Sequence, residues 1–340
     1  MRQIVECVPN FSEGRNTAVI DAIADSVRAV KGVKLLSAEP DKDYNRTVVT
    51  FAGDPTAVAE AAFQATKTAA GLIDMALHKG AHPRIGAADV VPFVPISGVS
   101  IDDCIRLANI YGERTARDLG IPIYLYEYAA RAPERKNLAE IRKGEYEGLS
   151  EKLKSPGWAP DYGKPIFNAK SGATVTGARK VLIAYNVNLD TADERIAHEI
   201  ALRIREIGRP KRDETDAVVK DEHGKTVRIP GTLNAVKAMG VLLRRCNIAQ
   251  VSINLVDYEI TSMHDAFDEV RRQARLLGVN ATGSELVGLA PLSAMLMAGR
   301  HYAGGGERDE RELVALAIRH LGLSDLEPFI PEKKIIDYAL

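Results

Sequence analysis

The sequence predicts an α/β protein of the α+β type, made of two similar subdomains that each carry a mixed sheet with helices on one face. Short apolar runs rich in β-branched residues alternate with longer amphipathic stretches in both halves of the chain, as strand–helix units do. Residues 155–180 separate the halves and hold three prolines, four glycines and the only tryptophan. With 340 residues, the chain is long enough for two domains of ordinary size.

The first half begins with a strand and a helix in close succession. Residues 17–30 are expected to be helical because apolar residues recur there at helical spacing. Gly120 and Pro122 mark the end of a later helix. The expected order is strand 3–9, helix 17–30, strands 33–37 and 46–51, helices 57–77 and 100–119, strand 121–125 and helix 133–153.

The second half repeats this alternation after the central loop. Its expected order is strand 181–188, helix 191–205, extended segments 217–220 and 226–229 around a His223-Gly224 turn, helix 232–246, strand 249–257 and helices 262–277, 291–298 and 307–321. We therefore expect one subdomain at residues 1–178 and the other at residues 179–340.

Composition excludes several classes of protein. Lys and Arg number 45 against 46 Asp and Glu, for a net charge of −1, whereas a chain-wide nucleic-acid surface is strongly basic. The three cysteines lie far apart and suit neither a disulfide framework nor a CxxC metal site. No window approaches the ~20 apolar residues of a membrane span, and the amino terminus turns polar too soon for a signal peptide. We expect a cytoplasmic protein that binds neither nucleic acid nor membrane.

The densest group of reactive side chains lies in the middle of the first half. This segment holds His78, His82, Arg84 and Asp89. His82 precedes Pro83, which biases the histidine toward an extended loop. An imidazole on such a loop can accept and donate protons near neutral pH. The alternative is that His82 is an ordinary solvated loop residue.

Metal and nucleotide motifs do not fit the sequence. Gly80 and Pro83 disfavour the helix that would bring His78 and His82 onto one face for zinc. The glycines at 304–306 follow no strand and lack the GxGxxG spacing of a nucleotide loop. We therefore predict no metal.

Two other loops offer groups for a polar ligand. Residues 10–16 follow the first strand and include Asn10 and Arg15, and loops beyond strand ends hold ligands in many α/β folds. The alternative is a turn that caps the next helix. Residues 172–180 offer backbone N–H groups, threonines and two cations to an anionic ligand, or form a simple turn into the next strand.

Several long segments are similar to the glutamate formiminotransferase family. They are residues 6–16, 45–53, 78–96, 158–163 and 172–189, with residues 250–264 and 286–296 in the second half. The resemblance implies helices on the outer face of each sheet, folate in a ligand cleft between the two sheets, and generally a homodimer. It also implies transfer of the formimino group from N-formimino-L-glutamate to tetrahydrofolate, giving 5-formimino-tetrahydrofolate and L-glutamate, in histidine degradation and one-carbon metabolism.

The resemblance also implies site residues. The family's catalytic histidine corresponds to His82, and its aspartate in the loop after the second strand corresponds to Glu39. From their chemistry, Asn10, Arg15 and Arg84 are further possible contacts to substrate. The family's folate-contacting loop corresponds to Gly163, Lys164, Pro165, Ile166, Phe167, Asn168, Ala169, Lys170, Ser171 and Gly172. Tetrahydrofolate is then a co-substrate.

His82 would move one proton in this reaction. The amine at position five of the reduced pterin must lose a proton when it attacks the formimino carbon, and the departing glutamate nitrogen must gain one. A single histidine can carry out both transfers. Two alternatives stay open: transfer of a formyl group from N-formyl-L-glutamate, whose donor carbon bears O in place of NH, and a non-catalytic folate-binding protein of the same fold.

Overall fold

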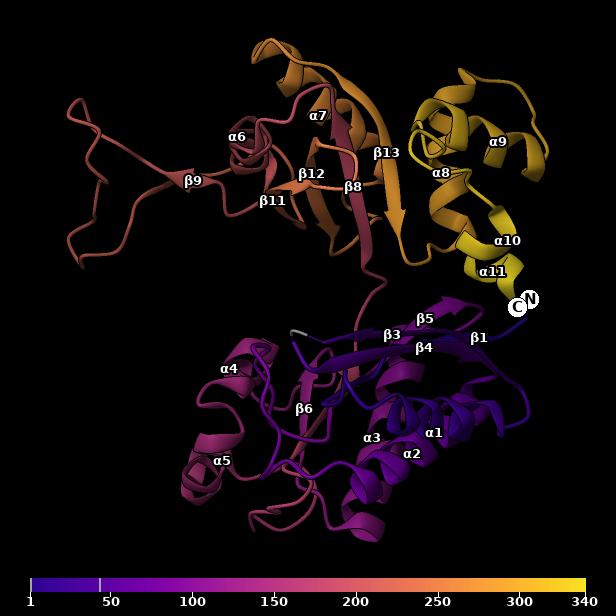
Figure 1. Ribbon diagram of the computed structural model, residues 1–340, viewed down its shortest axis with the longest axis vertical. Helices are drawn as coiled ribbons and strands as arrows, with labels where there is room; N and C mark the ends of the chain where they lie inside the picture. Colours follow the sequence, from indigo (N-terminus) through magenta and orange to yellow (C-terminus); the bar gives the residue numbers. More distant parts are fainter. Residues whose placement is uncertain (1, 43) are drawn as a thin grey trace. The chain divides into compact units, whose positions relative to one another are not determined.

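The chain folds into two units, each with its own sheet and helices (Figure 1). The computed structural model describes residues 2–42 and 44–340. The first unit runs to Lys180 and the second from Val181 to Ala339. No helix within the described ranges is long and apolar enough to cross a membrane.

The first unit is built on a mixed sheet whose strands run in the order β3, β4, β1 with β2, β5, β7 and β6. Its strands are β1 (Ile4–Cys7), β2 (Asn10–Phe11), β3 (Val33–Asp41), β4 (Arg46–Gly53), β5 (Ala88–Ser97), β6 (Ile123–Glu127) and β7 (Thr174–Ala178). Both β1 and β2 pair with β4 on one side and β5 on the other. They are therefore two pieces of one strand position, interrupted where Pro9 has no N–H to donate. β5, β7 and β6 are parallel to one another.

Helices pack against both faces of this sheet, whereas the sequence predicted helices on one face only. The helices are α1 (Thr17–Arg28), α2 (Pro55–Leu72), α3 (Ile101–Leu119), η1 (Pro133–Arg135), α4 (Leu138–Arg142), α5 (Glu145–Lys154) and η2 (Pro156–Trp158). α1, α2 and α3 pack on the face that buries Val5, Phe51 and Phe93. On the other face, Ile141 of α4 and Leu149 of α5 join a second core cluster with residues of β6 and β7.

The second unit has an entirely antiparallel sheet in the order β11, β12, β8, β13, and not the mixed sheet that the sequence predicted for each subdomain. Its strands and helices are β8 (Ile183–Leu189), α6 (Glu194–Ile204), β11 (Val236–Leu243), β12 (Ile248–Leu255), α7 (Met263–Leu276), β13 (Ala281–Val287), α8 (Leu292–Ala303), α9 (Glu310–His320), α10 (Pro331–Lys334) and α11 (Ile336–Ala339). A charged arm, residues 205–232, carries the short strands β9 (Arg209–Pro210) and β10 (Arg228–Ile229) and extends away from this sheet (Figure 1).

Both units contain the same βαββαβ arrangement, which confirms the prediction of two similar subdomains. In the first unit it comprises β1 with β2, α1, β3, β4, α2 and β5. In the second it comprises β8, α6, β11, β12, α7 and β13. In each, the first strand lies between the third and the fourth, and the second strand lies at the edge, as in ferredoxin-like folds. The first unit adds α3, β6 and β7 to this core.

Some expected elements differ from the structure. The helix expected at 232–246 is wrong, because residues Val236–Leu243 form β11, paired along its length with β12. Gly240 fits this strand tightly against α6, since a Cβ there would lie 2.3 Å from the backbone N of His198. The helix expected at 133–153 is interrupted, and Gly144 at a φ of +86° separates α4 from α5. The strands β5, β7 and β13 were not predicted from the pattern.

Candidate functional site

The predicted motifs converge at one end of the first unit's sheet. The parallel strands β5, β7 and β6 all begin there, and Phe11 of β2 pairs with Thr47 near the start of β4 and with Ala88 at the start of β5. The loops that lead into these strands carry the histidine segment and the predicted folate loop. Strands lie ~4.8 Å apart, so the starts of β5 and β6 are separated by roughly 10 Å.

A narrow, tightly packed pocket surrounds the histidines at this end. Its lining comprises Ser12, Tyr44, Asn45, Arg46, His78, His82, Arg84 and Asp89. Asn45 holds two of its loops together. Its Oδ1 accepts the N–H of Gly14 at 2.9 Å, and its Nδ2 donates to the carbonyl of Lys79 at 2.9 Å. Ser12 ties the first loop to the histidine segment by donating from Oγ to the Gly86 carbonyl at 2.7 Å.

His78 is fixed by hydrogen bonds on both ring nitrogens. Nε2 lies 2.9 Å from the carbonyl of Asn45, which can only accept, so this nitrogen carries the proton. Nδ1 accepts from Nε of Arg84 at 3.3 Å. Burial lowers the pKa of His78, and the nearby Arg84 contributes to this effect. His78 is therefore a neutral residue that supports the pocket wall.

Arg84 is held within the same wall. Its side chain is buried, and its guanidinium forms ion pairs with Glu145 and Glu147, both at 2.6 Å. With Nε donating to His78, all three guanidinium nitrogens have partners in the first unit. The sequence predicted Arg84 as a possible substrate contact, and the structure places its charge against two carboxylates.

His82 lies at the mouth of the pocket in a different environment. Its Nε2 accepts a hydrogen bond from the guanidinium of Arg46, and the ring of Tyr44 approaches edge-on with centroids 5.8 Å apart. Its Nδ1 is buried and has no hydrogen-bond partner among the residues that the structure describes. Burial lowers the pKa of His82, and the cations Arg46 and Arg142 lower it further. The imidazole is therefore neutral at pH 7 and suited to act as a base.

Asp89 and Arg142 form a buried ion pair close enough to influence the charge of His82. Asp89 is 2% exposed, and its Oδ1 accepts the N–H of Ile85 at 2.8 Å. Its other oxygen pairs with the guanidinium of Arg142 at the end of α4. Sequence reasoning missed both Arg46 and Arg142. Arg46 lies within the segment 45–53 that resembles the family, whereas nothing local distinguishes Arg142 from the other charges of its helix.

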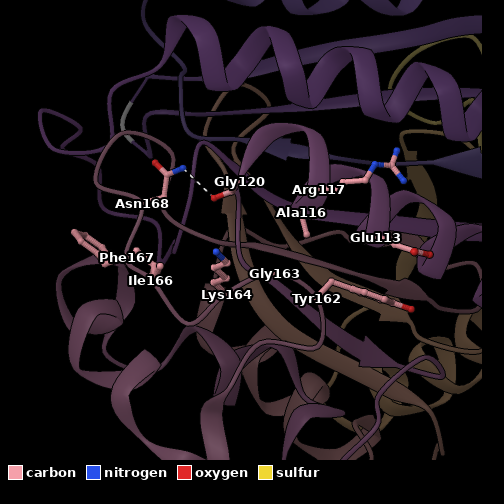
Figure 2. Close-up of a pocket in the computed structure, with 10 residues that line it drawn as sticks. All are labelled: Glu113, Ala116, Arg117, Gly120, Tyr162, Gly163, Lys164, Ile166, Phe167 and Asn168. Carbon is pink, nitrogen blue, oxygen red and sulfur yellow. Dashed lines mark hydrogen bonds between the residues drawn. The ribbon is translucent and has the colours of Figure 1, made fainter.

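The predicted folate loop borders a larger cavity of about 770 Å³ (Figure 2). Five of the ten predicted loop residues line it: Gly163, Lys164, Ile166, Phe167 and Asn168. The remaining wall comes from the end of α3 and from adjoining residues, namely Glu113, Ala116, Arg117, Gly120 and Tyr162. Asn168 Nδ2 donates to the Gly120 carbonyl at 3.3 Å, which joins the loop to the exit of α3 (Figure 2).

The last predicted loop residues anchor the loop instead of lining the cavity. Tyr146 donates from its hydroxyl to the carbonyl of Ala169 at 2.5 Å, and Lys170 Nζ donates to the Gly71 carbonyl at 2.7 Å. Pro165 is exposed between the lining residues. The loop therefore has a cavity-lining part, 163–168, and an anchored part, 169–172.

The anchored part is hydrogen-bonded directly to the histidine segment. The N–H of Ala87 donates to the carbonyl of Ser171 at 2.9 Å, and the N–H of Ala173 donates to the carbonyl of Ile85 at 3.0 Å. Glycine is required here, because a Cβ on Gly86 would lie 2.1 Å from the Ala173 oxygen, and one on Gly172 would lie 2.1 Å from the Ile85 oxygen. The two loops thus form one connected structure.

The remaining predicted contacts lie outside both linings. Asn10 donates from Nδ2 to the Val8 carbonyl at 3.1 Å. Arg15 is exposed and donates from Nε to the carbonyl of Lys42 at 2.9 Å. Glu39 is exposed on the edge strand β3. Within the described part of the chain, no group of three or more His, Cys, Asp or Glu side chains has the geometry of a metal site.

Both units match known sequence families. Residues 4–179 match the family model of the formiminotransferase domain, N-terminal subdomain, and residues 184–340 match that of the formiminotransferase domain. The chain therefore belongs to the formiminotransferase family, as its motifs indicated.

Particular relatives extend this assignment. Glutamate formimidoyltransferase of Streptococcus pyogenes serotype M1 is 45% identical over 302 residues, which cover 89% of this chain and 94% of that protein. The protein of the same name from Thermoplasma acidophilum is 42% identical and is covered to 92%. Formimidoyltransferase-cyclodeaminase of Rattus norvegicus is 47% identical over the whole of this chain, which spans 60% of the rat protein.

Proposed function

We propose that this chain is a glutamate formimidoyltransferase that moves the formimino group of N-formimino-L-glutamate to tetrahydrofolate, the co-substrate, with release of L-glutamate. One observation carries the proposal. The segment that bears the neutral His82 is hydrogen-bonded through its backbone to the predicted folate loop. Family membership and the printed name of the bacterial and archaeal relatives support the same reaction.

His82 is proposed as the catalytic residue. A neutral imidazole can take the proton of the attacking pterin nitrogen as the new N–C bond forms. The resulting imidazolium can return that proton to the glutamate nitrogen as the tetrahedral intermediate breaks down. The carboxylate of Asp89, which lines the same pocket, would stabilise the imidazolium in the interval, because a negative charge nearby favours the protonated form.

The cavity beside residues 163–172 is the proposed folate site. Its volume of about 770 Å³ lies within the range of pockets that bury ligands of this size. Phe167 and Ile166 offer apolar surface, and Lys164 offers a cation that could pair with a carboxylate of folate. By family resemblance we also propose a cytoplasmic homodimer, and Asn10, Arg15 and Glu39 as secondary substrate contacts.

A donor comparison tests the function. The protein is mixed with tetrahydrofolate and either N-formimino-L-glutamate or N-formyl-L-glutamate, and the absorbance of the folate product is followed. Faster turnover of the formimino donor is expected, whereas faster turnover of the formyl donor would identify a formyltransferase. His82→Ala should reduce turnover by ~10²–10⁴-fold and leave folate binding intact. Near-normal turnover of this variant would exclude His82 as the proton carrier.

A further inference from the structure

We propose that Arg46 binds a carboxylate of the glutamate donor, and that this contact withdraws the arginine from His82 and frees the histidine to accept a proton. The inference rests on the proposed function, because it assigns a residue to that reaction's donor. Under this proposal, His82 can accept a proton only when the glutamate donor is bound.

The contact between Arg46 and His82 occupies the nitrogen that catalysis requires. A guanidinium can only donate hydrogen bonds, so the Nε2 lone pair of His82 points to Arg46, and the neutral ring carries its proton on Nδ1. Nδ1 is itself buried and cannot reach a substrate in the pocket. While Arg46 stays in place, the one accessible lone pair of the imidazole is therefore engaged.

The surroundings of Arg46 favour an incoming anion. The side chain is partly buried, and burial together with the nearby cation Arg142 lowers the pKa of Arg46. Asp89 is the buried carboxylate of this pocket, but its oxygens already accept from Arg142 and from the N–H of Ile85. Asp41, at the exposed end of β3, accepts the N–H of Tyr44 at 2.9 Å. A carboxylate that enters from solvent would offset the repulsion between the two arginines.

Other cations near the pocket are less suited to this role. Arg84 is held by Glu145 and Glu147. Arg15 is exposed and donates to a backbone carbonyl, and Lys79 is exposed and does not line the pocket. Arg46 also lines the pocket, but its hydrogen-bond acceptor is the imidazole of His82. An imidazole is a weaker acceptor than a carboxylate, so an incoming carboxylate can replace it.

The exchange is favourable and the proton balance closes. A bond from a guanidinium to a carboxylate is roughly twice as strong as one to a neutral acceptor, so the donor can replace His82 as the partner of Arg46. His82 Nε2 then takes the proton of the attacking pterin nitrogen. It later gives that proton to the glutamate nitrogen as the carbon–nitrogen bond to glutamate breaks, and the imidazole returns to its neutral state.

Nitrogen NMR of the intact protein tests the exchange directly. The ¹⁵N signals of His82, assigned by their loss in His82→Gln, are recorded while L-glutamate is added. In the free protein we expect a protonated Nδ1 and a hydrogen-bonded, unprotonated Nε2. Saturating glutamate should shift Nε2 toward the value of an unbonded nitrogen without protonating the ring. An Nε2 signal that does not respond to bound glutamate would overturn the proposal.

Kinetics of Arg46 variants provide the second test. In Arg46→Gln, KM for N-formimino-L-glutamate should rise ~10–100-fold, and KM for tetrahydrofolate should change less than ~2-fold. Arg46→Lys keeps the positive charge but not the two parallel N–H donors of the guanidinium, so its KM for the donor should lie between those of wild type and Arg46→Gln. Arg28→Gln, which removes an exposed arginine of α1 paired with Asp25, serves as the matched control and should behave as wild type. An equal rise of both KM values, or a loss confined to kcat, contradicts donor binding by Arg46.

The two proposals fail in different ways. Wild-type protein that transfers no formimino group but still shows the glutamate-dependent shift of Nε2 would lose the proposed function and keep the carboxylate site. Active protein with no shift and no selective change in KM would keep the function and lose the role of Arg46.

Discussion

Two histidines four positions apart differ in role because their hydrogen-bond partners differ. His78 has an acceptor on one nitrogen and a donor on the other, so its ring is fixed and cannot take part in proton transfer without breaking a wall of the pocket. His82 accepts a hydrogen bond from Arg46 at Nε2, and the cations Arg46 and Arg142 lower its pKa, an effect that Asp89 only partly opposes. His78 therefore has a structural role, whereas His82 is a candidate base, although both are histidines of the same loop.

The pH dependence of turnover should report the lowered pKa of His82. A base must be neutral, so kcat/KM should be level above pH 6.5 and fall as the pH drops through the lowered pKa. In Arg46→Gln the acid limb should move to higher pH, because a cation that disfavours the imidazolium is gone. A pH–rate profile of both proteins measures this. A limb that moves to lower pH in the variant would contradict the assignment.

Loss of His78 should destabilise the first unit. His78→Gln leaves a buried carbonyl of Asn45 or Nε of Arg84 without its partner, which costs about 1–3 kcal/mol. Because the pKa of His78 is lowered in the folded state, wild-type stability should also fall as the pH drops below 6.5, and the variant should lose less there. Urea unfolding followed by fluorescence of Trp158, which lies in the first unit, measures both effects. Lys79→Gln, at an exposed neighbour, is the control and should unfold as wild type does.

At the scale of elements, the predictions agree with the structure where neighbouring residues determine the element, and fail where distant residues do. The helix expected at 100–119 is found at Ile101–Leu119, because Ser100 caps its start and Gly120, at a φ of +64°, ends it. By contrast, residues 232–246 contain good helix formers but form β11, whose partner strand and packing against α6 lie elsewhere in the sequence. Tertiary contacts thus override local propensity.

The candidate site divides in the same way. The loop of His82 and the glycines around 163–172 are recognisable because their sequence motifs are continuous. Arg142 reaches Asp89 from 53 positions away, and no spacing rule connects the two residues. The role of Arg84 was also beyond local reasoning, since its partners Glu145 and Glu147 lie about 60 positions away on α5.

Because β11 lies close to α6, adding a single methyl group at Gly240 should lower the free energy of unfolding. Gly240→Ala would place a Cβ 2.3 Å from the backbone N of His198. Because the obstacle is backbone, α6 must move, and we expect a loss of about 1–3 kcal/mol. Gly71→Ala in α2, where a Cβ would meet no atom within 4 Å, should be neutral or stabilising by up to ~1 kcal/mol. Denaturation followed by circular dichroism separates them, and equal stability of the two variants would contradict this packing.

At the scale of the whole molecule, the shared βαββαβ cores and the additions to them have different roles. The larger cavity lies where the first unit adds α3, β6 and β7, since the loop that leads into β7 and the end of α3 line it. The histidine pocket is lined instead by strands and loops of the shared core. The second unit instead adds helices α8 to α11 and the arm at 205–232. The duplicated core of the first unit supplies the histidine pocket, and the added elements supply the wall of the larger cavity.

The sheet of the first unit also holds a buried carboxylate that should lower its stability as the pH rises toward neutral. Glu6 on β1 is 7% exposed, and burial raises its pKa to about 7, with Arg179 partly opposing the shift. A raised folded pKa stabilises the protein below the unfolded value of 4.5, and this contribution is lost as the pH rises through about 7. Between pH 5 and pH 8 the loss amounts to roughly 2–3 kcal/mol at ~1.4 kcal/mol per pKa unit.

Glu6→Gln removes this titration and keeps a side chain of similar size. Relative to wild type, the variant should gain roughly 2–3 kcal/mol in free energy of unfolding between pH 5 and pH 8, because only the wild-type carboxyl must ionise in a buried position. Urea unfolding at the two pH values, read from Trp158 fluorescence, measures the difference. Glu134→Gln, at an exposed carboxylate of η1, should give the same difference from wild type at both pH values. If Glu6→Gln did the same, the carboxyl of Glu6 would already be ionised at pH 5, and its burial would not determine its charge.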